Sequence, residues 1–487
     1  MKLKAIALLI AFIQLIGFST SVYAMTDEQS NAIQSFLDDA QRISRAPGIA
    51  VAVFVDGETH FFSAGVANRN TGASVDEETL WVLASTSKAF TGLGVLLLEE
   101  QGLLSLSDSI TEHLPWLTFQ YQGQPIDMQD IRLYHFLHHT SGIGNSSGQQ
   151  MRTSRLNQDT LQISVESMID SELAFYPGER FEYGTRNYNI LGLVIETVTG
   201  QSYESFMEEQ VFLPLGLTQT FAYRNLAEST DRLAVGYAVQ FILFTTLSDS
   251  PETRGGVPEG GLISSARDME RWMRIQLGVA EDIPEIFKKI ISRSHEQGQS
   301  VVQNNGNFYA AGWNVNAEQT RIEHTGNSPG WMSNVVLFPE EQIGITLLTN
   351  AVINWDMVDN IKGILDGNLN QAYPMYFLQV LDILMTAITI FSGLAVALFI
   401  YFGWRRPRCI KKALMTKRRV MLIVFWAVIT IIMFIISYMF PSIVLGSGWT
   451  WPYAFIILPY SHLTGMLALA LLSVSITWFV AVTNKHL

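Results

Sequence analysis

The 487-residue sequence predicts an α/β domain over residues 25–370, followed by a C-terminal region of three transmembrane helices. Two observations predict this division. Short segments rich in β-branched and aromatic residues lie at both ends of the first part, and segments with helical periodicity lie between them. The second part contains three long runs without a charged side chain. We therefore expect the first and last strands of the domain to share one sheet.

The chain begins with a predicted secretory signal peptide at residues 1–24. A short basic start, Met1-Lys2-Leu3-Lys4, precedes an apolar run, and small residues lead to Ala24. Cleavage is expected after about Ala24. The alternative is an uncleaved membrane anchor, although the apolar run is short for a permanent span.

The domain itself begins with a helix and a hairpin. Apolar residues at helical spacing predict a helix over residues 27–43. Segments 49–55 and 59–64 flank Asp56-Gly57, a dipeptide typical of a hairpin turn. The later elements are expected as helices at 202–211, 266–277 and 354–365 and as strands at 308–315, 320–324, 333–338 and 343–349.

An apolar stretch over residues 239–247 lies where a loop is expected. A buried strand is the favoured interpretation. The alternative is a lip that meets substrate or membrane.

Ser85-Thr86-Ser87-Lys88 is the most informative stretch of the sequence. Residues three apart at the start of a helix lie on one face, so the Ser85 hydroxyl and the Lys88 amine would lie one turn apart. A nucleophilic serine needs such a neighbour to accept its proton. The four-residue pattern is short, and a solvated lysine at a helix start is the alternative interpretation.

Tyr183-Gly184-Thr185 supplies a second candidate group. A tyrosine beside an ammonium ionises more easily and can relay a proton. A core tyrosine with a satisfied hydroxyl is the alternative.

A third motif, His324-Thr325-Gly326, lies on a predicted strand that continues into Asn327. Glycine there would let the backbone of a ligand approach closely. The turn at His138-His139-Thr140-Ser141-Gly142 lies between these motifs and is open to a purely structural interpretation.

In this order, and together with Gly260-Gly261-Leu262-Ile263-Ser264-Ser265, the motifs resemble those of the penicillin-recognising serine hydrolases. The class C β-lactamase-related and penicillin-binding protein-like group is the most similar branch, and the resemblance covers about residues 27–365. It implies a β-lactamase-like fold, with an antiparallel sheet flanked by helices, a helical subdomain and an active site between them.

The resemblance also implies roles for individual residues. Ser85, Lys88 and Tyr183 would be catalytic, and which of Lys88 and Tyr183 takes the first proton stays open. Backbone N–H groups of Ser85 and Asn327 would hold the oxyanion. The residues that would contact substrate are Thr185, His324, Thr325, Gly326 and Asn327. The implied substrates are D-amino-acid peptides, peptidoglycan fragments or small esters and amides, hydrolysed through a serine acyl-enzyme without a cofactor.

Two positions depart from the family pattern. Thr185 stands where the family commonly has asparagine, and His324 stands where it commonly has lysine. An unperturbed histidine titrates near 6.5 and is mostly neutral at pH 7. We therefore expect poor turnover of β-lactams, which carry a carboxylate, and better turnover of neutral esters or amides. Lowering the pH toward 6 would then charge His324 and favour anionic substrates.

Three transmembrane helices are predicted at residues 376–404, 420–440 and 454–483. A buried core helix is the alternative for any one run but not for three in succession. The loop at 405–419 is rich in Arg and Lys, which marks the cytoplasmic side. The prediction is a multi-pass protein of the inner or plasma membrane whose catalytic domain is periplasmic or extracellular, close to the cell wall.

Composition limits the partners. The formal net charge is −13, and the part outside the basic loop is more acidic still, which argues against nucleic acid and against an anionic membrane surface as partners. The single cysteine, Cys409, lies in the basic loop, so the domain has no disulfide. No zinc-type Cys/His spacing and no phosphate-binding Gly-rich loop is present, so neither a metal nor a cofactor is expected. The oligomeric state is left open.

The alternative function is a non-catalytic, penicillin-binding-like sensor that binds cell-wall fragments and is coupled to the membrane helices. An intact Ser85, Lys88 and Tyr183 argue against it, because a pure binder does not need all three. A transporter is disfavoured, since three spans are few and none carries an internal charge pair.

Overall fold

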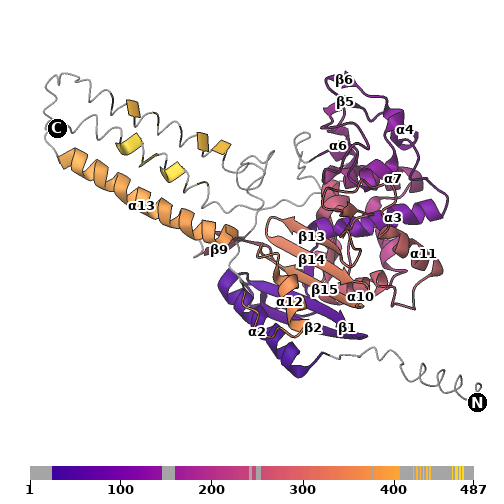
Figure 1. Cartoon of the computed structure of the whole chain (residues 1–487), viewed down its shortest axis with the longest axis horizontal. Coiled ribbons are helices and arrows are strands. Elements are labelled where there is room, and N and C mark those ends of the chain that lie inside the picture. Colours follow the sequence, from indigo (N-terminus) through magenta and orange to yellow (C-terminus); the bar gives the residue numbers. More distant parts are fainter. Residues whose placement is uncertain are drawn as a thin grey trace, which may run out of the picture.

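The computed structural model describes residues 25–144, 160–240, 244–247, 254–373 and 377–405, with single positions between 421 and 476. An eight-stranded sheet with the order β11-β12-β13-β14-β15-β1-β2-β3 forms its centre, and every pairing in it is antiparallel. Helices cover both faces of this sheet, and α13 extends away from the domain (Figure 1). The predicted signal peptide, most of the basic loop and most of the second and third predicted spans lie outside the described residues.

The predicted N-terminal helix and hairpin are confirmed. Helix α2 (Asp27–Ser44) begins at a capping box formed by Thr26 and Gln29. Strands β1 (Gly48–Val55) and β2 (Glu58–Asn68) follow. The turn between them holds Asp56 at φ 53° and Gly57 at φ 81°, the left-handed pair that a two-residue hairpin turn requires.

Strand β1 is buried on both faces, and its larger and smaller apolar residues alternate over residues 49–53 so that each kind faces one side of the sheet. Its larger residues, such as Val51, lie in the same apolar cluster as α2 and α12 (Met357–Leu365). Ala50 and Ala52 lie in the other cluster, with α3 (Ser87–Glu100) and α10 (Ala266–Gln276). Small residues on that face let helices approach the sheet closely.

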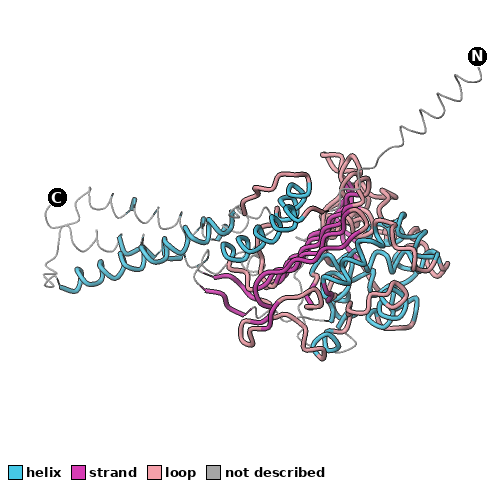
Figure 2. Tube along the Cα trace, turned by 90° about the horizontal axis from the view of Figure 1, so that it is seen from below, coloured by secondary structure: helices cyan, strands magenta, loops and turns pink. Residues whose placement is uncertain are grey.

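The first and last strands of the domain are neighbours, as predicted. β15 (Ile343–Thr349) pairs with β1, with Ile49 opposite Thr349. β14 (Trp331–Phe338) pairs with β15, and β13 (Ile322–Ser328) pairs with β14. The centre of the open sheet is therefore built from segments at opposite ends of the domain. The chain between these segments forms a helical subdomain against one face of the sheet (Figures 1 and 2).

This intervening chain is made of short elements. Its remaining helices are α4 (Ile110–His113), α5 (Leu133–Leu137), α6 (Thr160–Glu166), α7 (Arg186–Thr199), α8 (Tyr203–Phe206), α9 (Arg224–Glu228) and α11 (Glu285–Ser294). Its 3₁₀ and π turns are Ala84–Thr86, Met128–Asp130, Met207–Phe212, Arg254–Gly256 and Val257–Gly261. Its small sheets pair β4 (Leu80–Val82) with β10 (Ile263–Ser265), β5 (Phe119–Tyr121) with β6 (Gln124–Pro125) and β7 (Ser171–Glu172), and β8 (Tyr237–Gln240) with β9 (Phe244–Leu247). A further short strand, β3 (Ala73–Ser74), ends the main sheet.

The prediction of one strand over 308–315 is wrong. The structure has two short strands there, β11 (Phe308–Tyr309) and β12 (Asn314–Val315), which pair as a hairpin. Gly312 turns the chain at φ 87°, and a Cβ at this place would lie 2.5 Å from the Cα of Ala89. The turn thus packs directly on α3, and a continuous strand would not fit.

The apolar stretch at 239–247 overlaps the β8–β9 hairpin, of which residues 241–243 are outside the described part. A contact with substrate or membrane stays a prediction.

Helix α13 (Phe377–Arg405) coincides with the first predicted span. Its segment Val380–Leu398 is long and apolar enough to cross a membrane, and it is the single helix of that kind in the described part of the chain. The helix runs outward from the domain (Figure 2).

Candidate active site

Ser85 lies in a tight turn between β4 and α3. Ala84, the residue before it, has φ 46°, a left-handed conformation that is costly for a residue with a Cβ. Neighbouring contacts hold the turn in place. The Leu83 carbonyl accepts hydrogen bonds from the Thr86 hydroxyl (2.8 Å) and from the Ser333 hydroxyl of β14 (2.5 Å). The sheet therefore fixes the position of the serine.

The structure brings Ser85 and Lys88 together as the sequence predicts. The Lys88 Nζ lies 3.1 Å from the Ser85 Oγ, and the lysine side chain is 0% exposed. The same Nζ donates to the backbone carbonyl of Glu259 at 2.6 Å. Lys88 is therefore no solvated lysine: it is a buried amine oriented toward the hydroxyl.

Strand β13 passes directly beside this turn. A Cβ on Gly326 would lie 2.2 Å from the Leu83 carbonyl oxygen and 3.0 Å from the Ser85 nitrogen. Strand β12 pairs only with Ile322 and Glu323 among the described residues, so the rest of this edge of β13 is free for another backbone. Glycine is required here because the edge approaches the serine so closely.

Asn327 continues this edge beyond Gly326, and its side-chain amide is buried without a hydrogen-bond partner among the described residues. Thr325 lies partly exposed on the same strand. The structure thus places the predicted Thr325-Gly326-Asn327 stretch next to Ser85.

Tyr183 lies on the loop that leads into α7. The Lys88 Nζ is 5.2 Å from the centre of its ring, and its hydroxyl is buried without a partner in the described part of the chain. The hydroxyl is therefore free to take part in proton transfer near Lys88.

The His138–Gly142 turn supports this tyrosine, in line with the structural interpretation. The His139 Nδ1 accepts from the Gly184 N–H (3.3 Å) and from the Asn187 amide (3.1 Å), and its ring packs 4.4 Å from the Tyr183 ring. Two donors on Nδ1 place the proton of His139 on Nε2. Burial, followed by the Lys88 charge, holds the pKa of His139 well below its usual value. This histidine is a neutral packing residue.

His324 also lies in the cluster, but the expectation that it titrates near pH 6.5 is wrong. It is 2% exposed, its Nε2 accepts from the Tyr309 hydroxyl at 2.9 Å, and its Nδ1 donates to the Thr325 carbonyl at 2.7 Å. Burial and the neighbouring Lys88 lower its pKa to about 3. His324 therefore stays neutral at pH 6 and supplies no cation to a substrate carboxylate.

Thr185 meets a residue that the sequence reasoning missed. Its hydroxyl donates to the Glu259 carboxylate at 2.5 Å. Glu259 lies in the π turn Val257–Gly261, directly before the Gly260-Gly261 pair of the motif series. The sequence signal that could have indicated Glu259 as a site residue is its position directly before the Gly260-Gly261 motif.

The Val257–Gly261 turn and the residue that follows it, Leu262, are attached to α3 by three hydrogen bonds. Besides the Lys88 contact, the Thr91 hydroxyl donates to the Pro258 carbonyl (2.7 Å), and the Ser87 hydroxyl accepts from the Leu262 N–H (3.2 Å). Ser87 is therefore structural, and the position of Glu259 is set by the same helix that carries Lys88.

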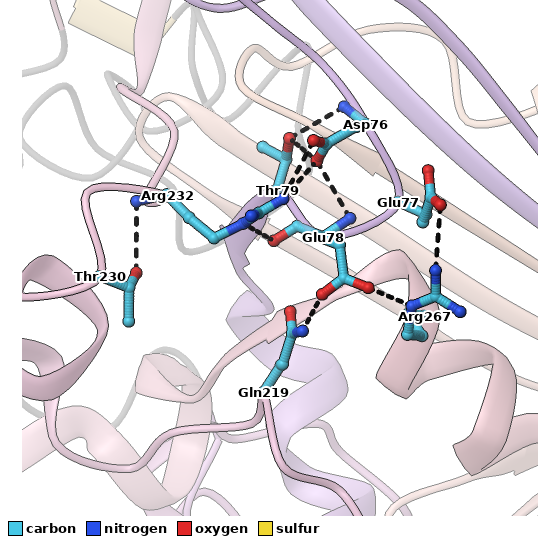
Figure 3. Close-up of polar contacts among 8 residues, drawn as sticks. All are labelled: Asp76, Glu77, Glu78, Thr79, Gln219, Thr230, Arg232 and Arg267. Atoms are coloured by element: carbon cyan, nitrogen blue, oxygen red, sulfur yellow. Dashed lines mark hydrogen bonds and ion pairs between the residues drawn. The ribbon is translucent and has the colours of Figure 1, made fainter.

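One cavity of the described structure has no wall formed by Ser85, Lys88 or Tyr183. It measures about 720 Å³, and its walls include Asp76, Arg232, Gly236 and Trp331. Close to it, Arg232 binds Asp76 at 3.0 Å, and Arg267 binds Glu77 and Glu78 (Figure 3). These partly exposed ion pairs connect the chain before β4 to α10 through Arg267 and to the segment before β8 through Arg232.

In the described part of the chain, no group of three or more His, Cys, Asp or Glu residues is placed to hold a metal ion.

Comparison with known proteins adds the family context. The profile of the Beta-lactamase family matches residues 33–368. Protein flp of Staphylococcus aureus is 27% identical over 453 residues, which cover 89% of this chain and 87% of that protein. Penicillin-binding protein 4 of Amycolatopsis lactamdurans is 28% identical over 330 residues, covering 65% of this chain and 84% of that protein.

Two solved structures share the fold. The octameric penicillin-binding protein homologue from Pyrococcus abyssi matches with a TM-score of 0.59 and 23% identity, covering 75% of this chain and 81% of that one. The β-lactamase/D-alanine carboxypeptidase from Pseudomonas syringae matches with a TM-score of 0.59 and 19% identity, covering 69% of this chain and 98% of that one.

Proposed function

Because the chain belongs to the Beta-lactamase family of serine hydrolases, we propose that it hydrolyses esters, amides or D-amino-acid peptides, including peptidoglycan fragments, through an acyl-enzyme on Ser85. One observation carries the proposal. A buried Lys88 amine lies 3.1 Å from the Ser85 hydroxyl, beside the free edge of β13. Hydroxyl, proton acceptor and backbone edge are the three parts that acyl transfer requires.

In the first step the Ser85 Oγ bonds to the substrate carbonyl carbon as its proton passes to Lys88 or Tyr183. The carbonyl π electrons move to oxygen, where the N–H groups of Ser85 and Asn327 hold the negative charge. The leaving group departs with a proton from the same relay, and water then hydrolyses the ester on Ser85. Loss of one oxyanion donor would cost about 3–4 kcal/mol of transition-state stabilisation.

The environment of His324 limits the class of substrate that the site can bind well. A neutral histidine with both ring nitrogens engaged offers no ion pair to a carboxylate. We therefore propose that β-lactams and peptides with a free carboxylate at the leaving side are poor substrates. This would separate the chain from the two activities for which the Pseudomonas syringae protein is named.

We further propose the domain order 1–24 signal peptide, 25–370 hydrolase, and membrane helices at 376–404, 420–440 and 454–483. In this topology the domain is periplasmic or extracellular, and the loop at 405–419 is cytoplasmic. Helix α13 supports the first span. The alignment with Protein flp covers 89% of the chain, which is more than the hydrolase domain alone, so at least some of the C-terminal region lies within the aligned part and supports this order.

The test is covalent labelling of the purified full-length protein by a fluorophosphonate, read by peptide mass spectrometry. We expect an adduct on Ser85, none in Ser85→Ala, and full labelling in Ser107→Ala, which changes an exposed serine on a different loop. Ser87→Ala is unsuitable as the control because that hydroxyl holds Leu262. Absence of any adduct on the folded wild-type protein would favour the non-catalytic sensor instead.

A parallel reaction with a penicillin tests the substrate argument. We expect little or no penicillin adduct on Ser85 under conditions where the fluorophosphonate reacts fully. Equal reaction with both reagents would contradict the role assigned to the neutral His324.

A further inference from the structure

We propose that Glu259 makes this site selective for substrates whose acyl group carries a positively charged amine, such as an aminoacyl amide or ester with a free N-terminus. The inference rests on the proposed function, because it assigns the substrate class of the same Ser85 site.

The position of Glu259 is the first argument. Its backbone carbonyl and the Ser85 Oγ are both within hydrogen-bond distance of the same Lys88 Nζ. The backbone of Glu259 therefore lies close to the Ser85 hydroxyl, and its side chain starts from the same end of the site. In an aminoacyl group the amine is only two bonds from the carbonyl carbon that Ser85 would attack, so it is the substrate atom most directly placed to meet a carboxylate here.

The orientation of its side chain is the second argument. The Thr185 hydroxyl donates to the Glu259 Oε2 at 2.5 Å, which turns the carboxylate toward the motif that the family uses for substrate contacts. Thr185 and Glu259 both remain partly exposed. A fixed, accessible carboxylate is a preorganised acceptor for an ammonium group.

The third argument is the charge balance of the site. Among the described residues, no lysine or arginine forms a salt bridge with Glu259. Lys88 already binds the Ser85 hydroxyl and a backbone carbonyl. His139 and His324 are neutral because burial lowers the pKa of each. Within the described structure the carboxylate thus has no salt-bridge partner, and a substrate ammonium would supply one.

The geometry also predicts what the site rejects. A carboxylate placed near Glu259 would meet a like charge, and in the described part of the chain the nearby cation, Lys88, is already hydrogen-bonded to Ser85 and to the Glu259 carbonyl. A neutral group of the same size would leave the Glu259 carboxylate as it is. Discrimination should therefore be largest between an amine and an isosteric neutral group at the same atom.

The experiment compares alanine p-nitroanilide with lactic acid p-nitroanilide, in which a hydroxyl replaces the amine. Both enantiomers of each are used at pH 6.5, where an α-amine is mostly charged. For the enantiomer that reacts faster, we expect kcat/KM of the full-length wild-type protein to be at least tenfold higher for the amine. In Glu259→Gln, which keeps an acceptor for Thr185 without the charge, this ratio should fall to about one.

Glu281→Gln is the matched control, since it removes a carboxylate at an exposed position on another part of the surface. Its amine preference should equal that of the wild type. If Glu259→Gln does not fold, as judged by circular dichroism, Glu259→Ala replaces it, and the wild-type ratio needs no variant at all.

Several results would overturn the inference. These are a wild-type ratio at or below one, an unchanged ratio in the Glu259 variants, or no turnover of either anilide by a protein whose Ser85 reacts with a fluorophosphonate. In the last case the acyl-transfer function stands and only the substrate class falls. Failure of the fluorophosphonate reaction itself would instead refute the proposed function.

Discussion

Replacing Gly326 by alanine tests the contact between strand β13 and the nucleophile turn. The backbone of Gly326 does not require glycine for its φ angle, so the substitution acts only through space. The new Cβ would lie 2.2 Å from the Leu83 carbonyl oxygen, 2.3 Å from the Ser333 hydroxyl and 3.0 Å from the Ser85 nitrogen. Since ordinary contacts of this kind exceed 3.4 Å, the strand and the turn must separate by about 1 Å.

That displacement sets the expected magnitude. A misplacement of about 1 Å at a reacting centre costs roughly 100-fold in rate. Overpacking of this kind destabilises a domain by about 1–3 kcal/mol, which leaves most molecules folded. The variant should therefore be folded but slow to acylate, because the N–H groups of Ser85 and Asn327, which are proposed to hold the oxyanion, would lie farther apart.

The assay is the second-order rate constant for fluorophosphonate labelling of Ser85, measured with a melting curve on the same sample. Gly393→Ala is the matched control, because a Cβ there meets nothing within 4 Å. We expect the control to react at the wild-type rate and Gly326→Ala to react roughly 100-fold more slowly. A folded Gly326→Ala protein that reacts within threefold of the wild type would refute the placement of β13 against the turn.

Two further predictions concern stability and topology. Burial lowers the pKa values of five histidines: to about 4 for His135, His138 and His295, to about 3 for His324, and well below the usual value for His139. Their contribution to stability is complete above the unfolded value of about 6.5 and is lost as the pH falls toward the folded values, at up to about 1.4 kcal/mol per pH unit for each histidine. Burial raises the pKa of Asp268 to about 6 and also raises the pKa of Glu208, and these two carboxyl groups act in the opposite direction against five histidines. The melting temperature should therefore fall between pH 7 and pH 5. A constant melting temperature would contradict the conclusion that these histidines are neutral in the folded protein. In intact cells, Cys409 should react with a membrane-impermeant thiol reagent only after permeabilisation; ready labelling without it would reverse the proposed orientation of the basic loop.

The sequence could predict those parts of the site that depend on local geometry. The spacing of Ser85 and Lys88 on a helix start is such a case, since one helical turn fixes their proximity wherever the helix lies. Strand positions near the end of the domain were also predictable from their composition. The pairing of β15 with β1 followed from the strands at both ends of the domain.

The missed features depend on contacts between distant segments. Thr185 and Glu259 are 74 positions apart, and they meet only because hydrogen bonds to α3 fix the Val257–Gly261 turn. The low pKa of His324 arises from burial and from the neighbouring Lys88, which its own sequence neighbours do not reveal. The segment 308–315 forms two strands instead of one for a similar reason, because Gly312 packs on helix α3, which is far away in sequence.

The pairing of β1 with β15 has a consequence for the order in which the protein is made. Strand β1 can pair with β2 early, but its other edge stays unpaired until the very end of the domain has been synthesised. Long-range strand pairing of this kind is slow and leaves an exposed edge that is prone to aggregation. Helix α13 follows soon after β15, so in the proposed topology the first membrane segment would reach the translocation machinery as the missing strand becomes available. Arrest of the chain at α13 would then hold the last strand close to the surface where folding is completed.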